Sequence, residues 1–170
     1  RKNPPSRYPA RRSNAGPSRV ARAARSVTGV TGRSSTGPDQ QLRHPATERD
    51  PEYDDKTGLR LDGRDLVAEW KRRHADGEYV WNQTQSAAAA KDKPLLALFE
   101  PSHMQFEHDR PKDRAGEPSL AEMTRSAMER RRDNPNGYVL LVEGGRIDHA
   151  HHYGNAYRAL TDTIAMSEAV

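Results

Sequence analysis

The sequence predicts an α/β fold, because short apolar runs alternate along the chain with segments of helical periodicity. Residues 94–99 are predicted to form a buried strand that ends at Glu100. Residues 138–142 form a continuous apolar run, which is typical of a strand buried on both faces of a parallel sheet. Segments with helical spacing surround these two runs.

The elements before residue 94 are predicted to be one helix, one short strand and a loose connection. The helix starts within residues 61–71, where Asp62 can serve as its N-cap. Its apolar face is formed by Leu66, Val67 and Trp70. After Gly77, residues 79–81 are predicted to form a short strand, and residues 86–93 a weakly packed connection or helical turn.

The elements after residue 100 are predicted to be a polar loop and two helices. The loop covers residues 101–116, and the first helix opens at Glu117 with Pro118 in its first turn. One face of this helix carries Leu120, Met123 and Ala127. The second helix runs from about Asp148 to the end of the chain, with an inner stripe of Tyr157, Leu160 and Ile164.

The charge of the chain divides it into two parts. Residues 1–44 hold ten Lys or Arg against one acid, whereas residues 45–170 hold 18 Lys or Arg against 23 Asp or Glu. Because residues 1–44 also lack apolar periodicity, we expect a disordered basic segment there, followed by a folded domain over residues 45–170. The basic segment is interpreted as a solvated tail or a sequence artefact, with a nucleic-acid-binding arm as the functional alternative.

Composition excludes several classes of protein. The chain has no cysteine, which rules out a disulfide scaffold and any cysteine-ligated zinc or iron–sulfur site. No apolar run approaches the roughly 18 residues that a membrane span needs. The first residues show no signal peptide, although an incomplete chain would lack one in any case.

The most informative segment for chemistry follows the apolar run 138–142. Glu143 stands at the predicted carboxyl end of that strand, where open α/β sheets place their ligands. Asp148 and His152 are four residues apart, so they share a face of a helix and suit zinc. Glu143 is a hard oxygen ligand that suits Mg²⁺ better. Spacing alone leaves open a solvated loop without any metal.

Residues 138–152 together resemble the metal-site segment of animal-type alkaline phosphatases: Tyr-Val-Leu-Leu-Val-Glu-Gly-Gly-Arg-Ile-Asp-His-Ala-His-His. The resemblance covers about residues 49–170. Besides the segment just given, it includes residues 61–70, 79–84, 98–101, 118–120 and 156–170.

This resemblance implies a three-layer sandwich with a mostly parallel central sheet, incomplete in this chain. It implies hydrolysis of phosphate monoesters through a phosphoserine intermediate, with two Zn²⁺, one Mg²⁺ and an additional Ca²⁺. The family's serine stands in an Asp-Ser-Ala stretch that this sequence lacks. We therefore expect an interior fragment, inactive alone, of a homodimeric enzyme that is extracellular or held at the cell surface by a lipid (GPI) anchor. No nucleic-acid partner is expected.

Carried onto matching positions, the resemblance assigns roles to individual residues. Glu143 is similar to the magnesium carboxylate, and Asp148 and His152 to two ligands of one zinc. His149 is similar to a group that lies near the phosphate and acts through water. No residue of this chain is assigned as the catalytic nucleophile.

The resemblance also implies a calcium site. Its members are the backbone carbonyl of Phe99 and the carboxylates of Glu100 and Glu117, the last standing where an Asp is usual. We expect Glu100 and Glu117 to lie close together at the surface, on either side of the loop 101–116. Asn82 begins an Asn-Gln-Thr triplet, a glycosylation acceptor that a secreted family makes relevant.

Two other functions compete with an alkaline phosphatase. One is a related metallohydrolase, such as a sulfatase or a phosphodiesterase-type enzyme, against which the Gly-Gly-Arg-Ile-Asp-His wording speaks. The other is a basic-tailed nucleic-acid-binding protein whose acidic domain is only a scaffold. A steep salt dependence of DNA binding traced to residues 1–44 would favour the second.

Overall fold

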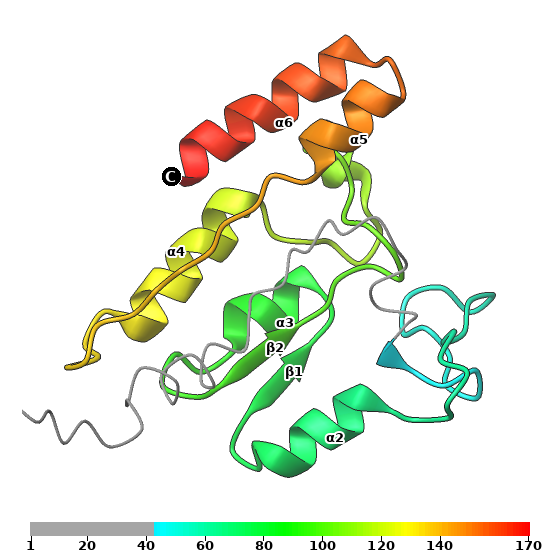
Figure 1. Cartoon of the computed structure of the whole chain (residues 1–170), viewed down its shortest axis with the longest axis vertical. Coiled ribbons are helices and arrows are strands. Elements are labelled where there is room, and N and C mark those ends of the chain that lie inside the picture. Colours follow the sequence, from blue (N-terminus) through cyan, green and yellow to red (C-terminus); the bar gives the residue numbers. More distant parts are fainter. Residues whose placement is uncertain (1–42) are drawn as a thin grey trace, which may run out of the picture.

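The computed structural model of the chain describes residues 43–170, so the predictions made for residues 1–42 lie outside the described residues. Figure 1 shows the order of the elements, which are α2 (Leu66–Arg73), β1 (Glu78–Val80), α3 (Gln83–Ala88), β2 (Leu95–Ala97), the 3-10 helix η2 (Arg110–Lys112), α4 (Leu120–Arg131), α5 (Arg146–His152) and α6 (Ala156–Ala169). No helix within residues 43–170 combines the length and the apolarity needed to cross a membrane.

Strands β1 and β2 form a two-stranded parallel sheet in which Tyr79 pairs with Leu96. A parallel pair needs a crossover connection, because the second strand must start at the same end as the first. Helix α3 provides it, lying between the two strands in the sequence. The predicted α/β class is confirmed at this level: helices combined with one small parallel sheet.

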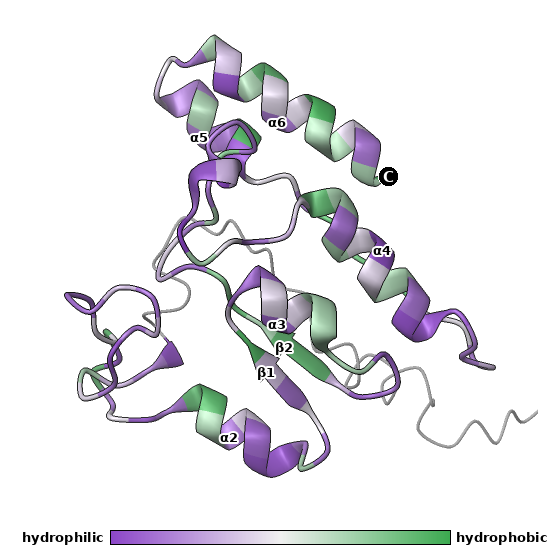
Figure 2. Cartoon of the chain, turned by 180° about the vertical axis from the view of Figure 1, so that it is seen from behind, coloured by the Kyte–Doolittle hydropathy of each residue, from purple (hydrophilic) through white to green (hydrophobic). Residues whose placement is uncertain are grey.

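Strand β2 is buried on both faces, because its side chains alternate between two hydrophobic clusters. Leu95, Ala97 and Phe99 pack in one cluster with Val80, Ala89 of the α3 side and Met123 of α4. Leu96 and Leu98 pack in the other with Val67 of α2. The sheet therefore lies between α2 and the α3–α4 side (Figure 1). Figure 2 shows the matching hydropathy, with hydrophobic residues along β2 and at the start of α2, and hydrophilic ones at the end of α2.

Helix α2 begins later than the sequence predicted. Its N-cap is Asp65, whose side chain accepts a hydrogen bond from the backbone N–H of Ala68 at 2.9 Å. The predicted cap, Asp62, is wrong, because its carboxylate instead accepts hydrogen bonds from the Arg60 side chain and from the backbone N–H of Arg64. Both aspartates have side chains suited to an N-cap, but only Asp65 stands at the position where the helix begins.

Helix α4 begins with a capping box that the sequence analysis did not identify. The Ser119 hydroxyl accepts from the backbone N–H of Glu122, and the Glu122 carboxylate accepts from the backbone N–H of Ser119. Pro118 therefore lies just outside the helix rather than in its first turn. Met123 is buried as predicted, with Leu120 packed against the same cluster.

The segment 138–142 is not the buried strand that was predicted. It is extended, but within residues 43–170 no strand pairs with it. Val139 is 82% exposed and Leu141 is 87% exposed. A strand in a sheet is buried together with its neighbouring strands, and the described residues provide no such strand for this segment.

The predicted last helix is divided into α5 and α6 by Gly154, which has a φ of +63°. The backbone N–H of Gly154 donates to the carbonyl of His151, and that of Asn155 to the carbonyl of Ala150, which is the Schellman arrangement that ends a helix. The side chain of Asn155 then caps α6. The expected inner stripe is also wrong: Tyr157, Leu160 and Ile164 are exposed, whereas Ala159 and Asp162 face inward.

Candidate functional site

Helix α5 places Asp148 and His152 one turn apart. The Nε2 atom of His152 lies 3.4 Å from the Oδ2 atom of Asp148, and both side chains are largely exposed. One imidazole and one carboxylate at this separation could serve as two neighbouring ligands of a zinc ion. A catalytic zinc usually takes three protein ligands, so this pair would need at least one more.

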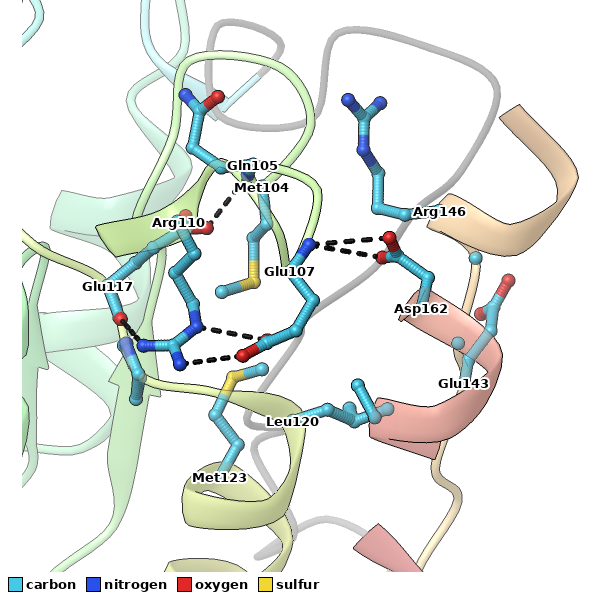
Figure 3. A pocket seen from close by; sticks show the side chains of 14 residues that line it. Met104, Gln105, Glu107, Arg110, Glu117, Leu120, Met123, Glu143, Arg146 and Asp162 are labelled. Atoms are coloured by element: carbon cyan, nitrogen blue, oxygen red, sulfur yellow. Dashed lines mark hydrogen bonds and ion pairs between the residues drawn. The ribbon is translucent and has the colours of Figure 1, made fainter. Parts of the chain in front are cut away.

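Glu143 precedes α5 and is exposed. Within residues 43–170 no hydrogen bond or ion pair joins it to Asp148 or His152, and the three do not converge into one cluster. Glu143 instead lies at the side of a small cavity of about 60 Å³. Figure 3 shows this cavity, crossed by the Glu107–Arg110 pair and by the contact from the Glu107 backbone N–H to Asp162.

His149, between the two zinc candidates in the sequence, faces inward. Its ring packs on that of His103 with centroids 4.3 Å apart. Its Nδ1 atom lies 3.2 Å from a guanidinium nitrogen of Arg146. Burial, followed by the nearby Arg146 charge, lowers the pKa of His149 below the ordinary histidine value. Burial therefore favours the neutral form of the ring, which is turned inward while Asp148 and His152 of the same helix are exposed.

A second constellation lies at the end of β2, where Glu52, Glu100 and Asp113 come together. One carboxylate oxygen from each lies within 4.8 Å of the others. Glu100 accepts hydrogen bonds from Gln105 Nε2 at 3.0 Å and from the Tyr53 hydroxyl at 3.5 Å. Three carboxylates from separate parts of the chain thus face one point.

Glu117, which was predicted to bind the same ion, is not one of these three carboxylates and is only 1% exposed. One of its oxygens accepts from the backbone N–H of Gln105 at 2.8 Å, so Glu100 and Glu117 contact the same residue. The other oxygen of Glu117, like one oxygen of Glu52, is buried without a hydrogen bond. The expectation that Glu100 and Glu117 lie at the surface is wrong, since both are buried.

Burial of these acids changes their protonation. Desolvation raises the pKa of Glu117 to about 9, and the charge of Glu100 adds to the effect. Desolvation raises the pKa of Glu100 to about 7, partly offset by the hydrogen bond from Gln105. The pKa of Glu52 is raised for the same reason. Buried carboxylate oxygens without partners are what a hard cation would satisfy, so the donor set fits Ca²⁺.

Sequence reasoning missed Glu52 and Asp113. Glu52 belongs to the acidic stretch 50–55, and Asp113 to the polar loop 101–116, so neither stands out from its neighbours. Only the folding of both loops against the end of β2 brings them to Glu100. The Phe99 side chain packs in the core, and a role for its carbonyl stays a prediction.

Asn82 has a structural role in addition to the predicted modification. Its side-chain oxygen caps α3 by accepting from the backbone N–H of Gln85 at 2.9 Å. Thr84 of the triplet is exposed. Capping uses the amide oxygen, whereas a glycan attaches to the amide nitrogen, so the two roles are compatible.

The chain is similar in sequence to known alkaline phosphatases. The alkaline phosphatase family matches residues 37–170. The tissue-nonspecific isozyme of alkaline phosphatase from Rattus norvegicus is 44% identical in an alignment of 142 positions that covers 79% of this chain. An alkaline phosphatase from Gadus morhua is 40% identical in an alignment of 141 positions that also covers 79% of this chain.

A solved structure gives the same result in three dimensions. The crystal structure of Thermus thermophilus alkaline phosphatase matches 62% of this chain and 22% of its own, with a TM-score of 0.56 and 36% identity. This chain spans 27% of the length of the rat relative and 29% of the cod relative. The matched family range includes every residue of the two constellations described above. The chain belongs to the alkaline phosphatase family.

Proposed function

We propose that this chain supplies part of the metal-dependent active site of an enzyme that hydrolyses phosphate monoesters through a phosphoserine intermediate. The observation that carries the proposal is the Asp148–His152 pair, which α5 holds at 3.4 Å within the region that matches the family. Because the chain spans only about a quarter of its relatives, the activity belongs to the larger assembly of residues that those relatives contain.

In this proposal Asp148 and His152 hold one zinc, and Glu143 holds a magnesium. Two such zinc ions in the complete site, when bound, stabilise the attacking and leaving oxygens of an in-line displacement at phosphorus. Helix α5 fixes the relative position of its two ligands. The loop before the helix leaves Glu143 exposed, so its carboxylate can reach a separate ion. The sequence contains no Asp-Ser-Ala stretch, so it supplies no nucleophile.

His149 has a different role, near the phosphate. It is neutral and inward-facing, and it contacts the phosphate through a water molecule instead of binding metal. Its packing on His103 and its contact with Arg146 limit its rotation. A restricted imidazole donor can orient a water without competing for the ions.

The buried acids bind Ca²⁺. Glu52, Glu100 and Asp113 provide one oxygen each. Glu117 is outside this group of three but shares its hydrogen-bond donor Gln105 with Glu100. Phe99 lies two residues after β2 and offers its backbone carbonyl. Carboxylate and carbonyl oxygens at about 2.3–2.6 Å are the usual calcium ligands. A bound cation would offset the desolvation cost that raises the pKa values of Glu100 and Glu117.

The larger fold in this proposal is a three-layer sandwich with a mostly parallel central sheet. Residues 45–170 contribute β1, β2 and the extended segment 138–142 to it. Burial of β2 between α2 and the α3–α4 side supports a layered arrangement. The enzyme is a homodimer, glycosylated at Asn82 and held at the cell surface by a lipid anchor, with no nucleic-acid partner. The family match begins at residue 37, eight residues before the predicted domain boundary at residue 45.

Zinc titration of the purified chain, followed by calorimetry, tests the metal pair. Wild-type chain should bind zinc weakly, and His152→Ala should reduce the affinity by about 10-fold or more, because it removes one of two ligands. His151→Ala is the matched control, since His151 is on the same helix but outside the pair, and it should bind like wild type. Equal zinc affinity in His152→Ala and wild type would contradict the proposal.

The isolated chain should hydrolyse no phosphate monoester above background. It offers a two-ligand site and no serine nucleophile for a covalent step. Release of phosphate from a chromogenic monoester, with and without added zinc and magnesium, measures this. Metal-dependent turnover by the chain alone would show that the proposed division of the active site is wrong.

A further inference from the structure

Helix α5 carries more potential metal ligands than the proposed zinc pair uses. They are Asp148, His149, His151 and His152. We infer that Arg146 holds His149 as a hydrogen-bond donor through its Nε2 atom, and thereby keeps it out of the metal-ligand set. Arg146 is thus a positioning residue that acts through His149. This inference rests on the proposed zinc pair only for its consequence, not for the contact itself.

Arg146 is the donor of the hydrogen bond that joins it to His149. The guanidinium nitrogen lies 3.2 Å from Nδ1 of His149, within hydrogen-bond range. A guanidinium has only donors and keeps its protons in proteins, so it must donate and Nδ1 must accept. A neutral imidazole has one N–H and one lone pair, so the proton of His149 is on Nε2.

This hydrogen bond determines whether His149 can bind a metal. A ring nitrogen binds a metal through its lone pair. In His149 the Nδ1 lone pair is occupied by Arg146, and Nε2 carries a proton. Neither nitrogen therefore offers a lone pair to an ion, whereas Nε2–H can donate to an oxygen acceptor. The contact with Arg146 therefore makes His149 a hydrogen-bond donor, while Asp148 and His152 on the same helix can still bind a metal.

Arg146 is itself held in place by the aromatic ring of Phe106. Its guanidinium lies 3.7 Å from the centroid of the Phe106 ring, a cation–π contact that fixes its plane. Within residues 43–170 it makes no ion pair with a carboxylate, and its one hydrogen bond goes to His149. A half-buried cation directed at a histidine instead of at an acid is unusual, because buried charges are normally paired.

Arg158 provides the matched comparison. It lies over the same Phe106 ring at 4.7 Å, but its guanidinium pairs with Asp109 at 2.7 Å and does not contact His149. Two arginines therefore share one aromatic ring, and only Arg146 contacts the imidazole. Replacing either arginine removes a similar packing contact with Phe106. Only the replacement of Arg146 also removes the hydrogen-bond donor to Nδ1 of His149.

The experiment is long-range proton–nitrogen NMR of the histidine rings in the ¹⁵N-labelled 170-residue chain at alkaline pH, with His149→Gln for assignment. In wild type we expect a non-protonated, hydrogen-bonded Nδ1 in His149. Zinc should shift the His152 ring signals and leave those of His149 in place. In Arg146→Met, Nδ1 should shift toward the value of a free imidazole, and zinc should then shift His149 as well. Arg158→Met should behave like wild type.

Two results would overturn the inference: a protonated Nδ1 of His149 in wild type, or identical His149 spectra in Arg146→Met and Arg158→Met. The first needs no substitution, so the inference can fail even if Arg146→Met does not fold. If zinc leaves His152 unchanged in every chain, the proposed zinc pair fails, while the zinc-free spectra still decide the role of Arg146.

Discussion

Residues 95–100 and residues 138–143 carry the same sequence pattern, five apolar residues followed by a glutamate, and they have opposite environments. In the first, every residue is buried, and Leu95 is 4% exposed. In the second, the chain is extended but unpaired within residues 43–170, and Leu141 is 87% exposed. The apolar pattern shows that both segments gain from burial, but not that burial is achieved.

The two segments differ in burial because different elements surround them. The first segment has β1 beside it and hydrophobic clusters on both faces, so its backbone and side chains are satisfied together. The second has helix α5 after it and no strand beside it among the described residues. A strand's stability depends on pairing and on covering layers, and these are supplied by other parts of the chain.

The terminal glutamates differ in the same way. Glu100 is buried among other acids, and its pKa is raised to about 7. Glu143 follows the unpaired segment and is exposed. A bound cation would offset the desolvation cost of the buried Glu100 carboxylate. The exposed Glu143 carboxylate is solvated by water and has no such cost to offset.

The largest expected effect tests the buried segment. Leu95→Ala should lower the free energy of unfolding by about 2–5 kcal/mol, because it leaves a cavity in a packed cluster. Urea denaturation followed by circular dichroism measures the loss. A loss below about 0.5 kcal/mol would mean that the core around β2 is not closely packed.

Calcium should distinguish the two glutamates. At about 100 times its Kd, Ca²⁺ should stabilise the wild-type chain by about 2.7 kcal/mol, because it binds only the folded state. Glu100→Gln should abolish most of this gain, whereas Glu143→Gln should retain it. Thermal unfolding in calcium and in a chelator gives both numbers. Equal loss in the two variants would contradict the assignment of the ion to the buried group.

In the absence of calcium, the free energy of unfolding should fall as the pH rises, because Glu117 loses its proton more readily in the unfolded chain. Its pKa is raised from the ordinary glutamate value of 4.5 to about 9 in the folded chain, so the folded state retains a proton that the unfolded state loses. Its contribution to stability is therefore present below pH 4.5 and is lost as the pH rises towards about 9.

Glu117→Gln removes this titration, and the variant should lose less stability over the same pH range. The difference should be several kcal/mol, because each unit between the folded and unfolded pKa corresponds to about 1.4 kcal/mol. Denaturation midpoints in chelator, measured from acid to alkaline pH, provide the check. Parallel curves for the variant and wild type would show that Glu117 does not cause the decline.

The smallest expected effect tests the exposed segment. Leu141→Ala, the same chemical change as Leu95→Ala, should alter the free energy of unfolding by no more than about 0.5 kcal/mol, because little contact is lost at an exposed position. The same urea experiment applies. A loss as large as that of Leu95→Ala would mean that residues 138–142 are paired in solution.

Some features of this protein follow from local sequence. The parallel strands β1 and β2 were predicted to within one or two residues, because their apolar runs are short and bounded by polar turns. The Asp148–His152 contact follows from the four-residue spacing alone, since that spacing places two side chains on one helix face. The resemblance to alkaline phosphatases also lies in consecutive residues, and the family match confirms it.

Other features depend on which distant segments meet. The sequence could not show that Glu52 and Asp113 join Glu100, because their loops look like any other acidic stretch until they fold against the end of β2. Nor could it show that Tyr157, Leu160 and Ile164 face outward, because periodicity defines a face but not which side is covered. The sequence alone determined strands β1 and β2 to within one or two residues and the helix face that Asp148 and His152 share, because local backbone geometry sets both. Tertiary structure decided burial, and with it the protonation of the acids, because both depend on atoms contributed from elsewhere in the chain.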